Sequence, residues 1–312
     1  MDESLRGVVG IQNMGNTCYC NSTIQILRAC QEWNVFCITQ DFSQLKDSNH
    51  KKILLAYQDI IKSICSAYKP SYVRPTGFLS EIRKAVKGTV YEMFAQSIPN
   101  DSHEFLTYLL DNFHEALKDD TQDNHFLGNS DVIRSFFGTM RNTIYCTNCK
   151  NNTYRLEVFN SLKIPCEGDT FKDWIQNEIK DSEIEGYQCD NCNTKSTAKI
   201  YSRIWKLPNN LFITMRRFNE NRTKNMTKCP YDGSNISFSE FFANESDDPS
   251  KNWVYELKGI SDHHGSHMGG HYNTQFKHPS NEWWKIDDET ANKQLPTFSA
   301  ANYIFLFVRQ NA

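Results

Sequence analysis

Apolar residues near the N-terminus recur at the spacing of a helix. After a turn-rich segment, residues 10–17, the side chains of Ile24, Leu27 and Cys30 fall on one face of a predicted helix. Glycine and asparagine favour tight turns, whereas the periodic apolar residues favour helix. The sequence therefore predicts that a helix begins close to Cys18.

A second helix is predicted over residues 101–118. Phe105 and Phe113 are two helical repeats apart in this segment, with leucines between them at positions that share the same face. Asp101 followed by Glu104 has the spacing of a capping box, which marks the start of a helix. We therefore expect residues up to about 130 to be mostly helical.

The pattern changes after about residue 130. Short β-like runs appear there, separated by asparagine, glycine and proline, and the polar segment 219–252 is predicted to be a loop. A helical half that precedes a β-rich half, without an internal repeat, predicts one α+β unit. The predicted strands are residues 136–143, 154–162, 198–205, 210–216 and the buried run 302–309.

The composition is that of a globular chain and excludes several classes of partner. Hydrophobic residues make up 39% of the chain, charged residues 23%, and the formal net charge is −3. There is no basic field for nucleic acid, no run of about 18 apolar residues to span a bilayer, and no signal-peptide core. We expect an intracellular protein, cytoplasmic, nuclear or both, that binds neither nucleic acid nor membrane.

The cysteines indicate a metal site. Eleven cysteines in a large chain without a secretion signal argue against a disulfide framework. Two CxxC pairs, Cys146 with Cys149 and Cys189 with Cys192, supply four thiolates, enough for a tetrahedral structural zinc ion. Their long separation predicts that the pairs close the far ends of two β-hairpins.

A nucleophile is predicted where the first helix begins. There the free N–H groups and the positive end of the helix dipole stabilise the thiolate of Cys18. The same N–H groups, with the side chain of Asn13, are suited to receive an oxyanion. Taken alone, however, Cys18 is better explained as a small buried side chain, as most free cysteines are.

A histidine-rich segment near the C-terminus offers the base. His271 is distant from Cys18 in sequence, as the partner of a cysteine nucleophile usually is, and Asp287 follows as an acid that would orient the imidazole. The alternative is a metal site, since His263, His267 and His271 are spaced four apart. The glycines among them argue against a helix, which that alternative needs.

Several segments, taken in order, resemble the motifs of the ubiquitin-specific protease family. These are Gly10-Ile-Gln-Asn-Met-Gly-Asn-Thr-Cys-Tyr-Cys-Asn-Ser, then Asp101-Ser-His-Glu-Phe, then Gly269-Gly-His-Tyr and Trp284-Lys-Ile-Asp-Asp. The resemblance implies a papain-like cysteine protease fold with thumb, palm and zinc-tipped β fingers. It implies one catalytic domain over residues 1–312, with the thumb at about 7–130, palm and fingers at about 131–312, and the fingers around 140–200.

The resemblance also implies roles for individual residues. Cys18 would be the nucleophile, His271 the general base and Asp287 its partner. Asn13 would be an oxyanion donor, and Asp288 falls on a second acidic position of the family. An auxiliary histidine of the family corresponds to His263, or in another register to His264.

A substrate channel follows from the same resemblance. Asp101 and Glu104 would face a groove that receives the arginine-bearing tail of ubiquitin, since paired carboxylates suit guanidinium groups. As residues alone, both acids are equally explained as helix caps. Phe218 and Tyr272 would line the narrow end of the channel or belong to the core.

The expected function is hydrolysis of the bond after the C-terminal glycine of ubiquitin, through a thioester on Cys18. The partners would be ubiquitin and ubiquitinated proteins, and whether an activating partner is needed stays open. Zinc would be structural. The alternatives are a protease for a ubiquitin-like modifier and a ubiquitin-binding module with little turnover.

Overall fold

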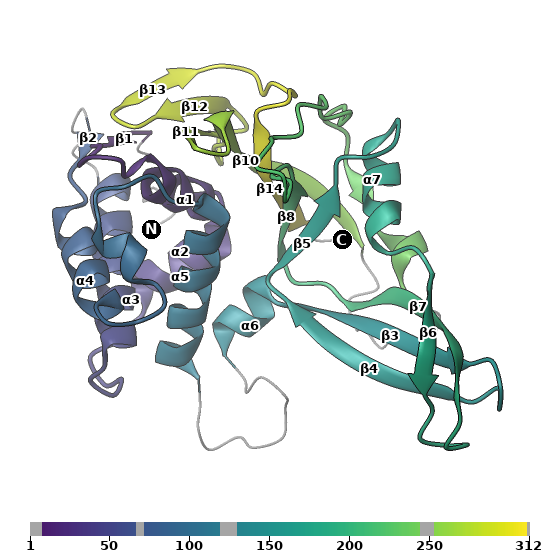
Figure 1. The fold of residues 1–312 in the computed structure, drawn as a ribbon. Helices are drawn as coiled ribbons and strands as arrows, with labels where there is room; N and C mark the ends of the chain where they lie inside the picture. The colour runs from purple at the N-terminus through teal and green to yellow at the C-terminus, as the bar shows by residue number, and fades with distance from the viewer. Residues whose placement is uncertain (1–7, 67–71, 119–129, 244–252, 311–312) are drawn as a thin grey trace.

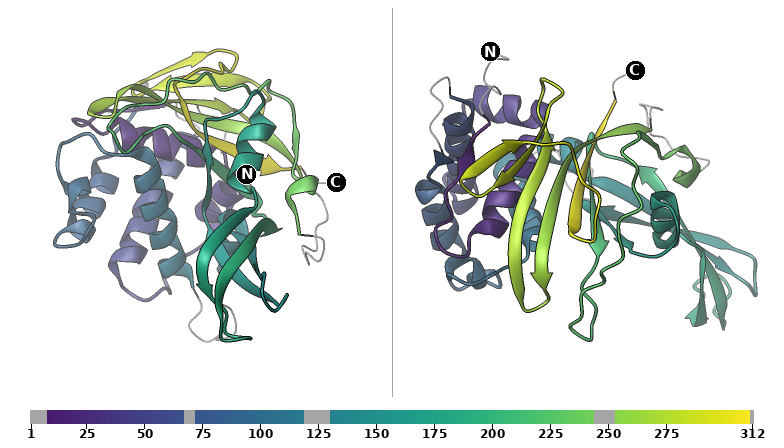
Figure 2. Two further views of the ribbon diagram at one scale, coloured as in Figure 1. Left: turned by 45° about the vertical axis from the view of Figure 1, so that its right-hand side comes forward. Right: turned by 90° about the horizontal axis from the view of Figure 1, so that it is seen from above.

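The structure, a computed structural model, describes residues 8–66, 72–118, 130–243 and 253–310. Figure 1 shows three parts: a group of helices, a large curved sheet beside it, and a smaller sheet that projects away from both. Seen from above, the strands of the large sheet lie between the helices and the smaller sheet (Figure 2). None of the helices in the described residues is long and apolar enough to cross a membrane.

Helix α1 (Cys18–Arg28) is the centre of the helical part, and every one of its residues is buried. Its apolar side chains belong to one core cluster with those of the helices around it. A short parallel pair, β1 (Gly10–Ile11) with β2 (Tyr72–Val73), holds the segment that leads into α1. The surrounding helices are α2 (Gln31–Thr39), α3 (Asn49–Cys65), α4 (Thr76–Val86), η2 (Glu92–Ala95), α5 (Ser102–Leu117) and α6 (Asp131–Phe136).

The large sheet has the strand order β13-β12-β11-β10-β14-β8-β5, and β9 pairs with β10. All of its pairs are antiparallel except β5 with β8. Helix α7 (Phe171–Glu178) and the short η3 (Ser239–Phe241) pack in its second core cluster. The strands are β5 (Ser161–Pro165), β8 (Asn210–Arg216), β9 (Ile236–Ser237), β10 (Val254–Ser266), β11 (Gly269–Lys277), β12 (Trp283–Asp287), β13 (Thr290–Lys293) and β14 (Asn302–Arg309).

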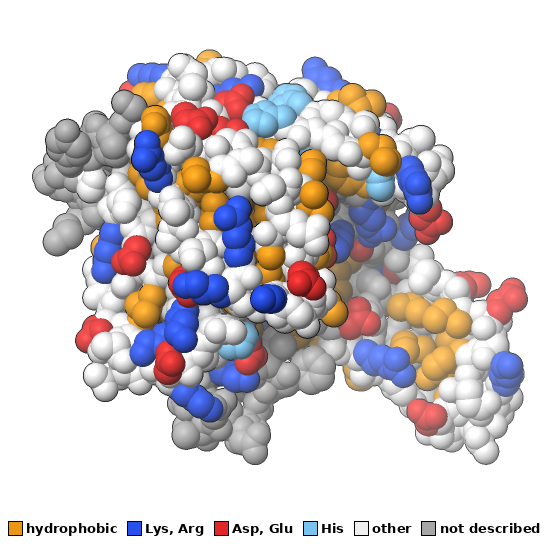
Figure 3. All heavy atoms as spheres, turned by 60° about the vertical axis from the view of Figure 1, so that its left-hand side comes forward, with side chains coloured by type: hydrophobic (Ala, Val, Ile, Leu, Met, Phe, Trp, Pro, Cys, Tyr) orange, Lys and Arg blue, Asp and Glu red, His pale blue; other side chains and the backbone are white. Residues whose placement is uncertain are grey.

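The smaller sheet has four antiparallel strands in the order β4-β3-β7-β6. On the face of this lobe that is visible in Figure 3, hydrophobic side chains gather beside basic ones. Tyr154 and Leu156 are exposed, and Arg141 packs on the ring of Tyr154. The strands are β3 (Gly138–Cys146), β4 (Asn152–Phe159), β6 (Ser182–Gln188) and β7 (Lys195–Lys206).

The predicted α+β order is confirmed, but one predicted strand is wrong. The run 154–162 divides at residue 160, because β4 pairs with β3 in the small sheet whereas β5 pairs with β8 in the large one. A side chain on Gly138 would lie 2.3 Å from the ring of Phe159, so glycine is needed where the two sheets separate. The run 136–143 also begins later than predicted, because Phe136 ends α6. The predicted strands 210–216 and 302–309 match β8 and β14.

Buried hydrogen bonds fix α1 against the large sheet. The hydroxyl of Ser22 lies 2.7 Å from that of Ser261 on β10 and 2.8 Å from that of Thr274 on β11. All three side chains are almost fully buried. Because a buried hydroxyl without a partner is costly, these bonds specify how the start of α1 faces the two strands.

The other end of α1 depends on Asn34. Its amide donates to the carbonyl oxygens of Leu27, Arg28 and Cys30 at 2.8–3.0 Å, and its side-chain oxygen accepts from Tyr57. The carbonyls of Leu27 and Cys30 also accept from the backbone N–H groups of Cys30 and Asn34, whereas the amide of Asn34 is the donor to the carbonyl of Arg28 at the helix C-terminus.

We therefore expect Asn34→Ala to lower the free energy of unfolding by about 1–3 kcal/mol, because the buried carbonyl of Arg28 and the hydroxyl of Tyr57 lose this partner. Urea unfolding would measure the loss. Asn235→Ala, at an exposed position, is the matched control and should change stability by less than about 0.5 kcal/mol. Equal effects of the two substitutions would contradict this role of Asn34.

Candidate active site

Cys18 is the first residue of α1, as predicted from the sequence. The turn before it is held by Asn13, whose side-chain oxygen accepts from the backbone N–H groups of Gly15 and Thr17. Gly15 has φ +94°, a backbone conformation that favours glycine. The asparagine therefore shapes the turn that delivers the cysteine to the helix N-terminus.

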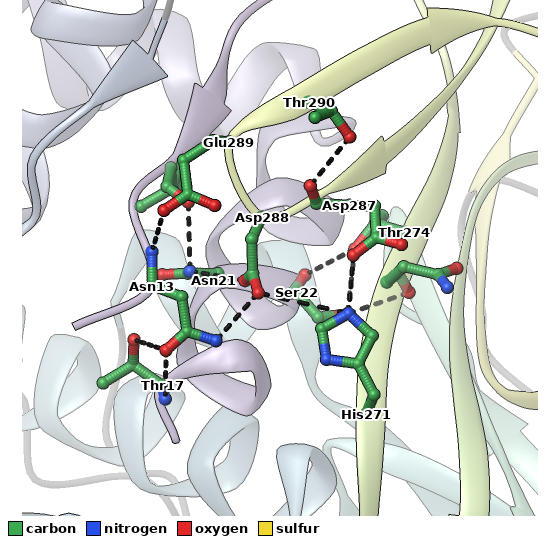
Figure 4. Close-up of polar contacts among 12 residues, drawn as sticks. Asn13, Thr17, Asn21, Ser22, His271, Thr274, Asp287, Asp288, Glu289 and Thr290 are labelled. Carbon is green, nitrogen blue, oxygen red and sulfur yellow. Dashed lines mark hydrogen bonds and ion pairs between the residues drawn. The ribbon is translucent and has the colours of Figure 1, made fainter. Parts of the chain in front are cut away.

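His271 and Asp287 meet across two neighbouring strands. His271 is near the start of β11 and Asp287 is at the end of β12, and His271 Nε2 lies 2.5 Å from Asp287 Oδ1 (Figure 4). Since Nε2 faces the carboxylate, Nδ1 is the ring nitrogen that remains for a thiol. The predicted pair of imidazole and orienting acid is thus formed by the fold.

Asp288 connects this pair to the N-terminal turn. Its carboxylate accepts from the side-chain amides of Asn13, at 2.8 Å, and Asn21, at 2.7 Å. Its Oδ2 also lies 4.0 Å from His271 Nε2 (Figure 4). The predicted oxyanion donor is therefore anchored through one hydrogen of its amide, and an amide carries two.

The backbone reinforces this connection. The carbonyl of Asp288 accepts from the N–H of Ile11, and the carboxylate of Glu289 accepts from the N–H of Asn13. Gly10 packs so closely here that a Cβ on it would lie 2.2 Å from the backbone of Glu289. The N-terminal segment and the turn after β12 thus form one unit.

The ionisation of Cys18 differs from the sequence expectation. The side chain is 6% exposed, and burial raises the pKa of the thiol above its ordinary value. The charge of Asp288 raises the pKa further, while the backbone N–H of Tyr272 opposes both. Cys18 and His271 are both in the described part of the chain, and no hydrogen bond joins the thiol of the first to the imidazole of the second. The backbone N–H groups of Cys18 and Tyr19 at the helix N-terminus lower the pKa, as the sequence predicts, but burial outweighs them in this state.

A cleft of about 280 Å³ opens onto Cys18. It adjoins a wider hollow of about 550 Å³ between α5 and β8, and the two share Asp101 and Phe218. Tyr272, the other predicted channel residue, lines the narrow cleft beside Cys18. The four predicted channel residues therefore all lie along this path, with Glu104 in the wider part.

The two predicted acids differ in their surroundings. Asp101 caps α5 through its Oδ1, and its Oδ2 accepts from the hydroxyl of Tyr303 at 2.7 Å. Glu104 is exposed; partial burial and the charge of Asp101 raise its pKa, and Lys163 opposes this. Glu104 does not return a bond to the N–H of Asp101, so the capping box is only half formed in this described helix. Glu104 is thus the carboxylate with free acceptor capacity.

The doubled histidine is resolved by the register of β10 and β11. His263 lies opposite Tyr272 and lines the cleft, whereas His264 lies opposite His271. A side chain on Gly270 would lie 2.5 Å from His263 Nε2, so this position needs glycine. Because His263 and His271 are on two antiparallel strands, the helical metal site of three histidines is ruled out.

The four CxxC cysteines come together at the tip of the small sheet. Their sulfur atoms lie within 4.8 Å of one another, in the turns after β3 and β6. The amide of Asn148 donates to the sulfur of Cys192, and that of Asn191 donates to the sulfur of Cys149, each at 3.5 Å. Each turn therefore supports a cysteine of the other.

Sequence reasoning missed three residues of the site. Asn21 and Glu289 hold the network around Asp288 and Asn13, and Lys224 contacts His263. Asn21 and Glu289 are close in sequence to predicted site residues, but no local sequence pattern indicates that Asn21 bonds to Asp288 or that Glu289 bonds to Asn13. Lys224 comes from the segment predicted to be a loop, where sequence periodicity carries no signal.

A buried cysteine at a helix start, with an imidazole–carboxylate pair on two neighbouring strands, defines the class of papain-like cysteine proteases. The family model for ubiquitin carboxyl-terminal hydrolase matches residues 9–307. The chain belongs to this family.

Curated relatives agree with this assignment. Ubiquitin carboxyl-terminal hydrolase Usp2 of Drosophila melanogaster is 29% identical over 343 residues, covering 99% of this chain and 35% of the relative. Ubiquitin carboxyl-terminal hydrolase 25 of Arabidopsis thaliana is 27% identical over 322 residues, covering 97% of this chain and 47% of the relative. The chain thus spans less than half the length of either relative.

Solved structures share the fold. The chain is similar to one in the SAGA DUB module Ubp8(C146A)/Sgf11/Sus1/Sgf73 bound to monoubiquitin, with TM-score 0.82 and 21% identity. That match covers 99% of this chain and 70% of the other. The same module bound to ubiquitin aldehyde gives TM-score 0.79 and 21% identity, covering 99% and 71%. The predicted fold class is confirmed.

The buried thiol gives a prediction about chemical reactivity. We expect alkylation of Cys18 by iodoacetamide to be slower at pH 7 than that of a free peptide thiol, with a midpoint at higher pH. Asp288→Asn should lower that midpoint, because it removes a negative charge. Mass spectrometry of the Cys18 peptide would follow the reaction, with Cys18→Ser as background. A midpoint below that of the free thiol would contradict the assignment.

Proposed function

We propose that the chain is a thiol-dependent deubiquitinase that hydrolyses the peptide or isopeptide bond after the C-terminal glycine of ubiquitin. The observation that carries this proposal is the position of Cys18 at the end of a narrow cleft, with the His271–Asp287 pair on the neighbouring strands. Membership of the ubiquitin carboxyl-terminal hydrolase family supports it.

The reaction starts with proton transfer. Nδ1 of His271 takes the proton of Cys18, and the sulfur attacks the carbonyl carbon of the terminal glycine. Asp287 stabilises the imidazolium through Nε2. Because the thiol and the imidazole are not hydrogen-bonded in this state, His271 must approach Cys18 when substrate binds. An activating partner protein would act on this approach.

The tetrahedral intermediate places its negative oxygen near the start of α1. The second amide hydrogen of Asn13 and the backbone N–H groups there donate to it. His271 then gives its proton to the leaving amine, so the C–N bond breaks and a thioester remains on Cys18. Water, deprotonated by His271, attacks the thioester and releases ubiquitin and the thiol.

The shape and charge of the path fit the tail of ubiquitin, which ends in two glycines after arginine-bearing residues. The narrow cleft, with glycine at position 270, leaves little room for side chains beside Cys18. Glu104 in the wider hollow is the acceptor for an arginine, whereas Asp101 shapes the hollow through its bond to Tyr303. The small sheet would hold the globular body of ubiquitin.

The four clustered cysteines fit a structural zinc ion. Tetrahedral zinc with Zn–S bonds of about 2.3 Å needs sulfurs about 3.8 Å apart. Cys146 and Cys192 lie 4.0 Å apart, and Cys149 and Cys189 lie 3.7 Å apart. Eleven unpaired cysteines suit a reducing, intracellular compartment. We propose one catalytic domain in which zinc closes the tip of the fingers.

The function is tested by release of a fluorophore from the C-terminus of ubiquitin. We expect Cys18→Ala to lower turnover by at least about a thousandfold, because no other group replaces the nucleophile. Cys20→Ala, two residues away and buried, is the matched control and should retain turnover. Absence of turnover by folded wild type would contradict the proposal. Cleavage of a ubiquitin-like tail alone, or tight ubiquitin binding without turnover, would identify the alternatives.

The zinc ion is tested separately. We expect about one zinc per chain in the purified wild type and none in the Cys146→Ser/Cys189→Ser variant. Loss of the metal should weaken binding of ubiquitin while leaving alkylation of Cys18 unchanged, because the cluster is at the tip of the other sheet. Cys229→Ala is the control that should keep the metal. Full zinc content in the double variant would rule out these ligands.

A further inference from the structure

Lys224 makes an unusual contact with the buried histidine of the cleft. Its ammonium nitrogen lies 3.0 Å from Nδ1 of His263 and also donates to the carbonyl oxygen of His263. Lys224 is only partly exposed, and in the described part of the chain it forms no ion pair. A half-buried ammonium is thus directed at an imidazole rather than at a carboxylate.

This contact defines which ring nitrogen carries the proton. An ammonium group only donates hydrogen bonds, so Nδ1 of His263 must be the acceptor and the hydrogen of the neutral ring is on Nε2. Burial, and then the charge of Lys224, lower the pKa of His263 to about 4. His264 and His271 act in the same direction and Asp101 opposes them, so His263 is neutral at physiological pH.

Nε2 of His263 is on the side of the cleft. It lies against Gly270, where an added Cβ would be 2.5 Å away, and both residues line the cleft that opens onto Cys18. Within the described residues, Nε2 has no hydrogen-bond partner. The rings of Tyr272 and Phe218 hold the imidazole at centroid distances of 4.7 and 5.3 Å. The fold thus fixes a donor in the cleft and leaves it without an acceptor.

Hydrogen bonds also fix the backbone around Lys224. A bridge pairs Lys224 with Phe218 across a tight turn. The fully buried guanidinium of Arg217 donates to the carbonyl oxygens of Asn225 and Thr227, which follow Lys224. The lysine therefore approaches His263 from an ordered turn, although this segment is outside the regular strands.

We propose that Lys224 is a positioning residue that fixes His263 as the Nε2–H tautomer, so that His263 donates a hydrogen bond to a carbonyl oxygen of the substrate tail beside Cys18. The proposal rests on the proposed function, because it needs a tail in the cleft. Among the described residues, Lys224 is the charged group that contacts Nδ1 of His263 and can therefore set this tautomer.

The first test is spectroscopic and independent of turnover. In the wild type, nitrogen-15 NMR of the histidine rings should show His263 protonated at Nε2, with the signal assigned from its loss in His263→Ala. Lys224→Met keeps the aliphatic stem and removes the donor, so we expect the Nδ1–H tautomer to become populated. Lys228→Met, at an exposed position in the same loop, is the control. An Nδ1–H tautomer in the wild type, or no change in Lys224→Met, would overturn the proposal.

The second test measures turnover of the ubiquitin fluorophore substrate. We expect Lys224→Met to lower kcat about tenfold with little change in KM, because the bond strengthens in the transition state. Lys224→Arg should restore most of the activity. The Lys224→Met/His263→Ala double variant should be no slower than His263→Ala. Additive losses would overturn the proposal, whereas inactive wild type with the expected tautomers would contradict only the proposed function.

Discussion

The carboxylate of Asp288 joins the two ends of the chain into one site. The carboxylate accepts hydrogen bonds from Asn13 in the N-terminal turn and from Asn21 in α1. Asp288 itself directly follows Asp287, the residue that orients His271. The side chain of Asp288 is about one-tenth exposed, so these bonds are shielded from competing water. Without this connection, the side chain of Asn13 would lose its bond to the segment that follows Asp287, and the backbone bonds of the N-terminal turn and the Ser22 hydroxyl would remain to join the two parts. A cysteine protease needs closer control, because proton transfer and attack depend on the relative placement of groups from both ends.

The packing of α1 also fixes the position of Cys18 relative to the strands that carry His271. Every residue of the helix is buried, and Ser22 bonds to both strands that hold His263 and His271. Cys18 therefore sits on an element that cannot rotate or slide without breaking buried hydrogen bonds. The other side of the cleft is lined by the hairpin between β10 and β11. Gly265 and Gly269 have positive φ there, and Met268 at its tip is exposed.

The sequence was informative wherever a local pattern determines the structure. The start of α5, the strands β8 and β14, the cysteine at the helix N-terminus and the two CxxC turns all follow from periodicity, caps or spacing. The division between β4 and β5 did not, because it depends on which sheet each half meets and on the close approach of Gly138 to Phe159. The roles of Asp101 and Lys224 also escaped, since Tyr303 and His263, their partners, are far away in sequence. The direction of the Cys18 pKa depends on burial, which no motif reports.

The charge of Asp288 has two opposing consequences for catalysis. It orients Asn13, which the proposed mechanism uses to bind an oxyanion, yet it also raises the pKa of Cys18 and disfavours a thiolate before substrate arrives. The pair His271–Asp287 resolves this conflict, because an imidazolium formed next to Asp287 is stabilised at the moment when the thiol loses its proton. The thiolate would then exist mainly as part of an ion pair with His271 and in the presence of a carbonyl to attack. In the proposed mechanism, such an arrangement would keep the buried thiol unreactive towards other electrophiles until a substrate tail fills the cleft, so the same contacts that assemble the site would also restrict its reactivity.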